Sequence, residues 1–132
     1  MSASSRQILN SPDAPAAVGP YSHATRVSGE LLFISGQVPL DPVTAEIVGE
    51  TPAAQARRCL ENLEIIAKAG GSSLANSVKV TIYLIDMAAF AEVNEVYAEF
   101  FPTDPPARVT VAVAGLPKGS LVEMDAVVAV GA

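Results

Sequence analysis

Residues 105–113 read PPARVTVAV, and the rest of the chain can be interpreted around this stretch. Each proline disfavours helix in the residue before it, so the segment is expected to be extended. As a strand it places Val109 and the next two valines on one face, able to join a core, and Arg108 and Thr110 on the other. A guanidinium is costly to bury unless it is paired, and its planar fork suits a carboxylate. Two interpretations of Arg108 stay open: a group that binds a small carboxylate, or a strand-edge side chain that reaches water or a neighbouring acid.

The length and composition indicate one globular domain. The 132 residues are interpreted as a single domain, with residues 1–10 as a flexible extension. Hydrophobic residues make up 50% of the chain and charged residues only 17%, which is typical of a protein with a large core. Because few charges are available to cover the surface, we expect part of the apolar surface to lie in a subunit interface.

The charge balance and the scarcity of cysteine and histidine exclude several classes of function. Eight basic against fourteen acidic residues give a net charge of −6, and no basic run exceeds the pair Arg57–Arg58. This argues against nucleic acid and membranes as partners, while a local basic pocket could still bind a small anion. With one cysteine and one histidine, we expect no disulfide within the chain and no Cys/His metal cluster. The lack of a long apolar run and of an apolar centre near the start predicts a soluble, cytoplasmic protein.

Hydrophobic periodicity predicts two helices and five strands in the order β-β-α-β-α-β-β. Residues 1–20 are expected to be mostly irregular because three prolines interrupt them. The predicted strands are 24–27, 31–35, 78–85, 108–113 and 121–130, with 28–30 as a hairpin turn, and the predicted helices are 52–69 and 88–101. Thr51 is placed as the cap of the first helix, and Cys59, on its apolar stripe, is expected to fill the core. The order predicts an α+β fold: a mixed β-sheet with two helices packed on one face and another subunit on the other.

A few polar side chains are candidates for chemistry. Glu123 alternates with apolar neighbours in the last strand, so it is a solvated carboxylate, a partner of Arg108, or a proton-handling group in an anion pocket. Asn94 lies between Phe90 and Tyr97 on the apolar stripe of the second helix, where a buried amide needs a partner. Tyr21 is a hinge residue or supplies a pocket hydroxyl, and Ser35 is a strand end or a hydrogen-bond donor.

Two further positions lie beside these candidates. Thr110 is interpreted as a small polar wall next to Arg108, and His23 as a surface residue. The sequence contains no phosphate-binding loop, dinucleotide fingerprint or paired metal-ligand motif.

Seven segments, taken in order, resemble the Rid/YjgF/UK114 family of reactive imine and enamine deaminases over roughly residues 10–130. They are GPYS (19–22), FISGQ (33–37), LENL (60–63), VKVTIYL (78–84), VNEVY (93–97), PAR (106–108) and LPKG (116–119). The resemblance implies the chorismate-mutase-like (YjgF) fold, a homotrimer, and active sites in clefts between subunits.

The resemblance also implies which residues form the site. The family's essential arginine corresponds to Arg108, and its other site positions correspond to Tyr21, Ser35, Asn94 and Glu123. Two positions depart from the family pattern. Thr110 stands where a cysteine is usual, a change that bears on substrate preference, and His23 stands where a glutamine is common.

The implied activity is hydrolytic deamination of 2-iminopropanoate and 2-iminobutanoate to 2-oxo acids and ammonia, without metal or cofactor. Arg108 would clamp the substrate carboxylate, Glu123 would hold the attacking water and move protons, and Tyr21 and Ser35 would donate hydrogen bonds. The expected partners are the small 2-imino or 2-oxo acid and other copies of the chain. A non-catalytic carboxylate-binding or chaperone-like trimer, and an endoribonuclease, are the alternatives.

Overall fold

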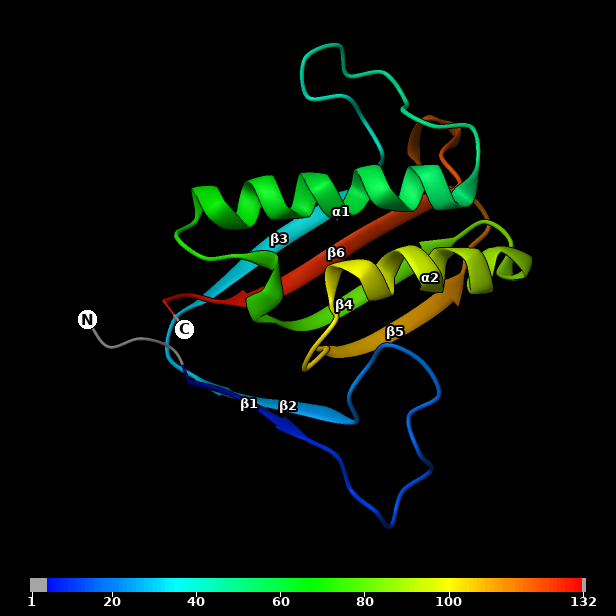
Figure 1. Cartoon of the computed structure of the whole chain (residues 1–132). Helices are drawn as coiled ribbons and strands as arrows, with labels where there is room; N and C mark the ends of the chain where they lie inside the picture. The colour runs from blue at the N-terminus through cyan, green and yellow to red at the C-terminus, as the bar shows by residue number, and fades with distance from the viewer. Residues whose placement is uncertain (1–4, 132) are drawn as a thin grey trace.

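The computed structural model describes residues 5–131 and contains two sheets and two long helices (Figure 1). The larger sheet has four strands in the order β3-β6-β4-β5, and the smaller sheet pairs β1 with β2. The strands are β1 (Ser5–Leu9), β2 (Ala24–Ser28), β3 (Leu31–Gln37), β4 (Ser77–Leu84), β5 (Ala107–Ala112) and β6 (Val122–Ala129). The helices are α1 (Pro52–Ala69) and α2 (Phe90–Phe100).

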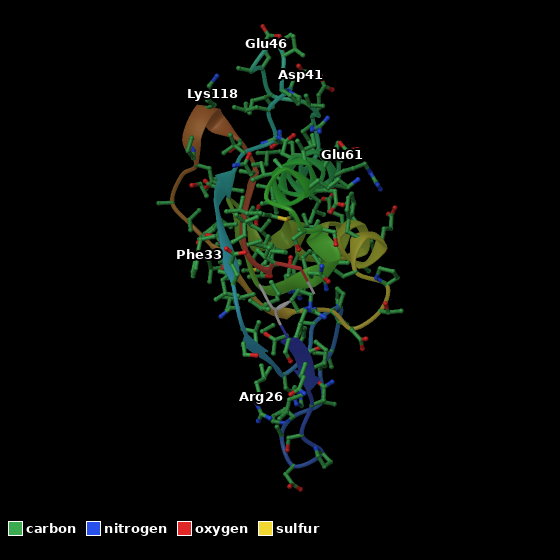
Figure 2. The ribbon with its side chains drawn as sticks, turned by 90° about the vertical axis from the view of Figure 1, so that its left-hand side faces the viewer. Arg26, Phe33, Asp41, Glu46, Glu61 and Lys118 are labelled. Carbon is green, nitrogen blue, oxygen red and sulfur yellow. The ribbon has the colours of Figure 1, made fainter. Side chains whose placement is uncertain are left out.

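Both helices cover the same face of the four-stranded sheet, as the sequence predicts. Seen from the side, α1 and α2 lie on one side of the sheet and Phe33 on the other (Figure 2). The core between sheet and helices is formed by fully buried side chains such as Leu60, Leu63, Val80, Ile82, Tyr97 and Met124. We call the uncovered side the open face. It carries Phe33, Val109 and Val111, which are 72%, 42% and 36% exposed.

The first helix follows local sequence signals closely. Thr51 Oγ accepts the Ala54 N–H at 3.1 Å, and Pro52 occupies the first turn, where its missing N–H costs nothing. At the other end the Gly70 N–H donates to Ile66 O at 3.0 Å. Cys59 is fully buried on the apolar stripe, which confirms its predicted place in the core. Burial raises the pKa of its thiol to about 12, because the thiolate cannot be solvated there.

Two predictions about the first 37 residues are wrong. Residues 5–9 form β1, which pairs antiparallel with β2, although residues 1–20 were predicted to be mostly irregular and 1–10 a flexible extension. Residues 1–4 lie outside the described part of the chain. The turn at 28–30 does not form a hairpin either, because β2 pairs with β1 while β3 pairs with β6. The turn therefore passes the chain from the small sheet to the large one.

The expected faces of β5 are also exchanged. The valines were predicted to join the core, but Val109 and Val111 lie on the open face, and Arg108 points to the helix side. In the parallel pairing of β4 with β5, Arg108 lies opposite Val80 and on the same face of the sheet. Val80 is fully buried under the helices. Alternation along a strand separates two faces but does not say which one the helices cover.

Within residues 5–131, neither helix is both long and apolar enough to cross a membrane.

The second helix begins at Phe90 rather than at the predicted residue 88, because a short 3₁₀ turn (Met87–Ala89) precedes it. Asp86 caps this turn, accepting the Ala88 N–H at 2.9 Å.

Candidate active site

Arg108 lies on the edge strand β5 and reaches under α2. Its Nη1 donates to Asn94 Oδ1 at 2.6 Å, which gives the Asn94 amide the partner that its place on the apolar stripe requires. Within residues 5–131 no carboxylate pairs with Arg108, so most of its N–H donors stay available. Burial lowers the pKa of Arg108, which shows that the cation is held partly out of water, where an anion is a favourable neighbour.

Three aromatic rings surround the guanidinium. The Arg108 Cζ lies 5.0 Å from the ring centre of Tyr97, 5.5 Å from that of Tyr21 and 5.7 Å from that of Phe90. Such contacts stabilise a cation by about 0.5–1 kcal/mol each, and more when desolvated. The sequence predicted Phe90 and Tyr97 only as apolar residues of a helix. Their spacing around Asn94 was the available signal that all three share the face toward Arg108.

The segment before β2 forms a wall beside Arg108, and Ser22, to which the sequence gave no role, anchors it. The Ser22 N–H donates to Pro106 O at 3.1 Å, and its Oγ donates to Pro105 O at 2.5 Å. Tyr21, next in the chain, therefore stays close to β5, with its hydroxyl accepting the Val18 N–H at 3.3 Å.

Gly19 gives this wall its close approach to the arginine. Its φ of +135° lies where only glycine is unstrained. A Cβ there would lie 3.3 Å from Asn94 Nδ2 and 3.8 Å from Arg108 Nη2. A cavity of about 450 Å³ opens between this wall and the strands, and its lining includes Tyr21, His23, Lys79 and Arg108. We call Tyr21, Asn94 and Arg108, with their surrounding rings, the arginine half-site.

Glu123 and Ser35 lie together in a different place, on the open face. Ser35 is exposed on β3, where the pairing with β6 is irregular between Ile34 and Gln37. The Glu123 carboxylate fills the space above Gly36 in this irregularity: a Cβ on Gly36 would lie 1.9 Å from Glu123 Oε2. We call Ser35 and Glu123 the carboxylate half-site.

A single chain does not bring the two half-sites together. Arg108 lies opposite buried Val80 of β4, on the face of the sheet that the helices cover. Glu123 lies opposite Tyr83 of β4, on the face that points away from the helices. Ser35 and Arg108 also lie on the two edge strands, three strand spacings or about 14 Å apart. The idea that Glu123 pairs with Arg108 is therefore wrong within one copy.

Two other sequence interpretations are revised. Thr110 lies on the same face of β5 as Arg108, but it is not among the described residues that line the cavity. Its hydroxyl is buried and has no hydrogen-bond partner within residues 5–131. His23 is not a simple surface residue, because it is half-buried and both of its ring nitrogens lie at hydrogen-bond distance from main-chain atoms.

The part of the chain that the structure describes has no cluster of three or more His, Cys, Asp or Glu side chains that could hold a metal ion.

Comparisons with known proteins agree with this fold. The family model described as Endoribonuclease L-PSP matches residues 11–130. The mouse protein named 2-iminobutanoate/2-iminopropanoate deaminase is 43% identical over 131 residues, which cover 99% of this chain and 96% of that protein. Protein DfrA of Myxococcus xanthus is 49% identical over 123 residues, 92% of this chain and 94% of that one.

A solved structure extends the agreement to three dimensions. The crystal structure of RidA from the Antarctic bacterium Psychrobacter sp. is 41% identical and superposes with a TM-score of 0.74, covering 94% of this chain and 99% of that one. The chain belongs to the Endoribonuclease L-PSP family, which includes the Rid proteins. The resemblance drawn from the sequence motifs is confirmed, and so is the α+β architecture with a mixed sheet and two helices.

Proposed function

We propose that this protein is an enzyme that hydrolyses small 2-imino acids, such as 2-iminopropanoate and 2-iminobutanoate, to 2-oxo acids and ammonia. The observation that carries the proposal is Arg108, a partly buried cation without a carboxylate partner in residues 5–131, held by Asn94 and three rings beside an open cavity. A small molecule with a carboxylate fits such a group. The names of the mouse and human relatives, both 2-iminobutanoate/2-iminopropanoate deaminase, support this substrate class.

The arginine half-site binds and orients the substrate. Arg108 donates hydrogen bonds to the substrate carboxylate from the N–H groups that Asn94 leaves available, a contact of about 1.5–3 kcal/mol. The Tyr21 ring and Gly19 shape the wall against which the imine lies. Holding the imine carbon in one orientation toward a water contributes to the rate without any covalent step on the protein.

The carboxylate half-site supplies the water chemistry, and we propose that it comes from a second copy of the chain in a homotrimer. Within one copy Glu123 lies on the opposite face of the sheet from Arg108, and the open face carries exposed apolar side chains that another copy can cover. Glu123 accepts a proton from the water as the water oxygen bonds to the imine carbon, and it passes that proton to the nitrogen. It then transfers the proton of the new hydroxyl to the nitrogen, so that the C–N bond breaks as the C=O bond forms and ammonia leaves, with Ser35 beside the carboxylate as a hydrogen-bond donor.

The description of the family as endoribonucleases suggests RNA as another substrate, but the charge of this chain does not favour it. The net charge is −6, and an RNA backbone requires a surface that neutralises several phosphates. Among residues 5–131, Arg108 and Lys79 are the lysine and arginine residues that line the 450 Å³ cavity, which suits one small anion.

The test is a coupled assay in which a pyridoxal-dependent threonine dehydratase releases the imine and the formation of 2-oxobutanoate is followed. Arg108→Ala is expected to lose the acceleration, because the carboxylate contact alone corresponds to about 10- to 100-fold. Arg26→Ala, an exposed arginine on β2, is the matched control and is expected to keep full activity. Full activity in Arg108→Ala, or binding of 2-oxobutanoate by the unaltered protein without any acceleration, would contradict the proposal.

Mixed oligomers test the shared site. Arg108→Ala and Glu123→Gln should each be inactive alone, and co-expressed together they should regain part of the activity, because some clefts then combine an intact arginine with an intact glutamate. Failure of every mixture, with mixed oligomers demonstrated, would place both residues' roles within one copy.

A further inference from the structure

His23 ties together the loop of residues 10–23 that connects β1 with β2. Its backbone N–H donates to Asn10 Oδ1 at 2.8 Å, and its ring Nδ1 accepts the Ser11 N–H at 3.0 Å. Its ring Nε2 lies 2.6 Å from Pro15 O. Three contacts from one residue thus fix the first half of the loop to the start of β2.

The partners of the imidazole define its protonation state. A backbone N–H can only donate, so the Nδ1 that faces Ser11 carries no proton. A backbone carbonyl can only accept, so the Nε2 that faces Pro15 carries one. The neutral ring with its proton on Nε2 satisfies both contacts. A second proton on Nδ1 would set two donors against each other and break the contact with Ser11.

This loop is also the wall of the arginine half-site. Ser22 anchors the strand side of the wall to Pro105 and Pro106, while His23, the next residue, anchors the outer side through Ser11 and Pro15. Tyr21, whose ring lies 5.5 Å from Arg108 Cζ, stands directly before these two anchors. The cavity beside Arg108 is lined by Pro15 and His23 as well as by Tyr21.

We propose that His23 is a positioning residue for the arginine half-site, and that the hydrogen bonds of its backbone and imidazole hold the wall in place. The effect on catalysis rests on the proposed function, whereas the effect on the loop does not.

The first measurement follows the loop directly. His23 is the only histidine in the chain, so the imidazole ring-nitrogen chemical shifts in an NMR spectrum belong to it. We expect an unprotonated Nδ1, a protonated Nε2 and a Ser11 amide that is protected from hydrogen exchange. The Ser22 amide, bonded to Pro106 O, serves as the internal control and should stay protected in the His23 variants.

Variants separate hydrogen bonding from packing. In His23→Gln the side-chain amide offers one acceptor and one donor, so it should keep the Ser11 amide protected. His23→Ala should lower the protection of the Ser11 amide by about 10-fold or more and raise the KM for the imine more than it lowers kcat. His23→Gln should restore the KM.

Two results would overturn the proposal: a proton on Nδ1 in the unaltered protein, or a Ser11 amide that stays as protected in His23→Ala as in the unaltered protein. If the protein hydrolyses no imine but the loop responds as described, the proposed function fails and the role of His23 in the loop stands.

Discussion

At the scale of single residues, a few atoms fix the candidate site, and most of their partners are remote in sequence. Arg108 and Asn94 are 14 positions apart in the chain, and Ser22 is bonded to Pro105 across 83 positions. The residue types at these places could be predicted, because a buried amide and a buried guanidinium both need partners. Which atom meets which could not, since alternation along a strand does not reveal which face the helices cover.

Gly36 provides a test of the carboxylate half-site that leaves Glu123 itself unchanged. Neither Gly36 nor Gly115 has a φ in the left-handed region, so alanine fits the backbone at both. In Gly36→Ala the new Cβ would meet Glu123 Oε2 at 1.9 Å, so the carboxylate must move. We expect deamination to fall by about 10-fold or more, because a displaced base loses its alignment with the water.

Gly115→Ala is the matched control for this substitution. An added Cβ there meets nothing within 4 Å, so activity should be unchanged and stability equal or slightly higher. Both variants are compared in the coupled assay and by urea unfolding. Equal activity in the two proteins would show that the position of Glu123 does not matter for the reaction.

At the scale of elements, prediction succeeded where the signals are local and failed where pairing is long-range. The helix α1 begins at the predicted cap and ends at the predicted residue 69, because Thr51 and Gly70 act on their own neighbours in the chain. By contrast, the 28–30 turn looks like a hairpin locally, yet β3 pairs with β6 almost 100 residues later. β1 was missed because its five residues are stabilised as a strand only by pairing with β2.

The cap of α1 can be tested separately from the site. Thr51→Ala removes the Oγ that accepts the Ala54 N–H at 3.1 Å and leaves that donor without its cap. We expect the free energy of unfolding to fall by about 1 kcal/mol without loss of specific activity. The measurement is urea unfolding at one fixed protein concentration, because an oligomer's apparent stability depends on concentration.

Thr103→Ala, at an exposed threonine outside every helix and strand, is the control for the Thr51 variant. Its free energy of unfolding should change by less than about 0.5 kcal/mol. An unchanged stability in Thr51→Ala would mean that packing of α1 against the sheet, rather than its cap, determines how the helix begins.

At the scale of the whole molecule, the two half-sites and the open face lead to one expectation. The sequence predicted that one face of the sheet would meet the helices and the other a subunit, and the structure leaves an apolar face open beside the carboxylate half-site. Composition indicated this surplus of apolar surface, but the arrangement of copies depends on contacts that no single chain contains. The trimer therefore remains a prediction, and Phe33 is the residue through which to test it.

Phe33→Glu places a charge at the most exposed of the aromatic and valine side chains on the open face, at 72% exposure. If a second copy covers this face, the charge must be buried without a partner, which costs far more than the lost apolar contact. We expect light scattering to show a shift from trimer to smaller species and the coupled assay to show a parallel loss of activity. The helical circular dichroism signal should be kept, because Phe33 points away from the core beneath α1 and α2 (Figure 2).

Val43→Glu is the matched control for the Phe33 variant. Val43 is 91% exposed on the loop between β3 and α1, away from the open face, so the same charge there should leave mass and activity unchanged. A Phe33→Glu protein that keeps both its mass and its activity would show that the open face is not an interface, and the carboxylate half-site would then need another route to Arg108. Loss of activity without a change in mass would instead place Phe33 in the wall of the cleft, because the copies would still assemble around a damaged site.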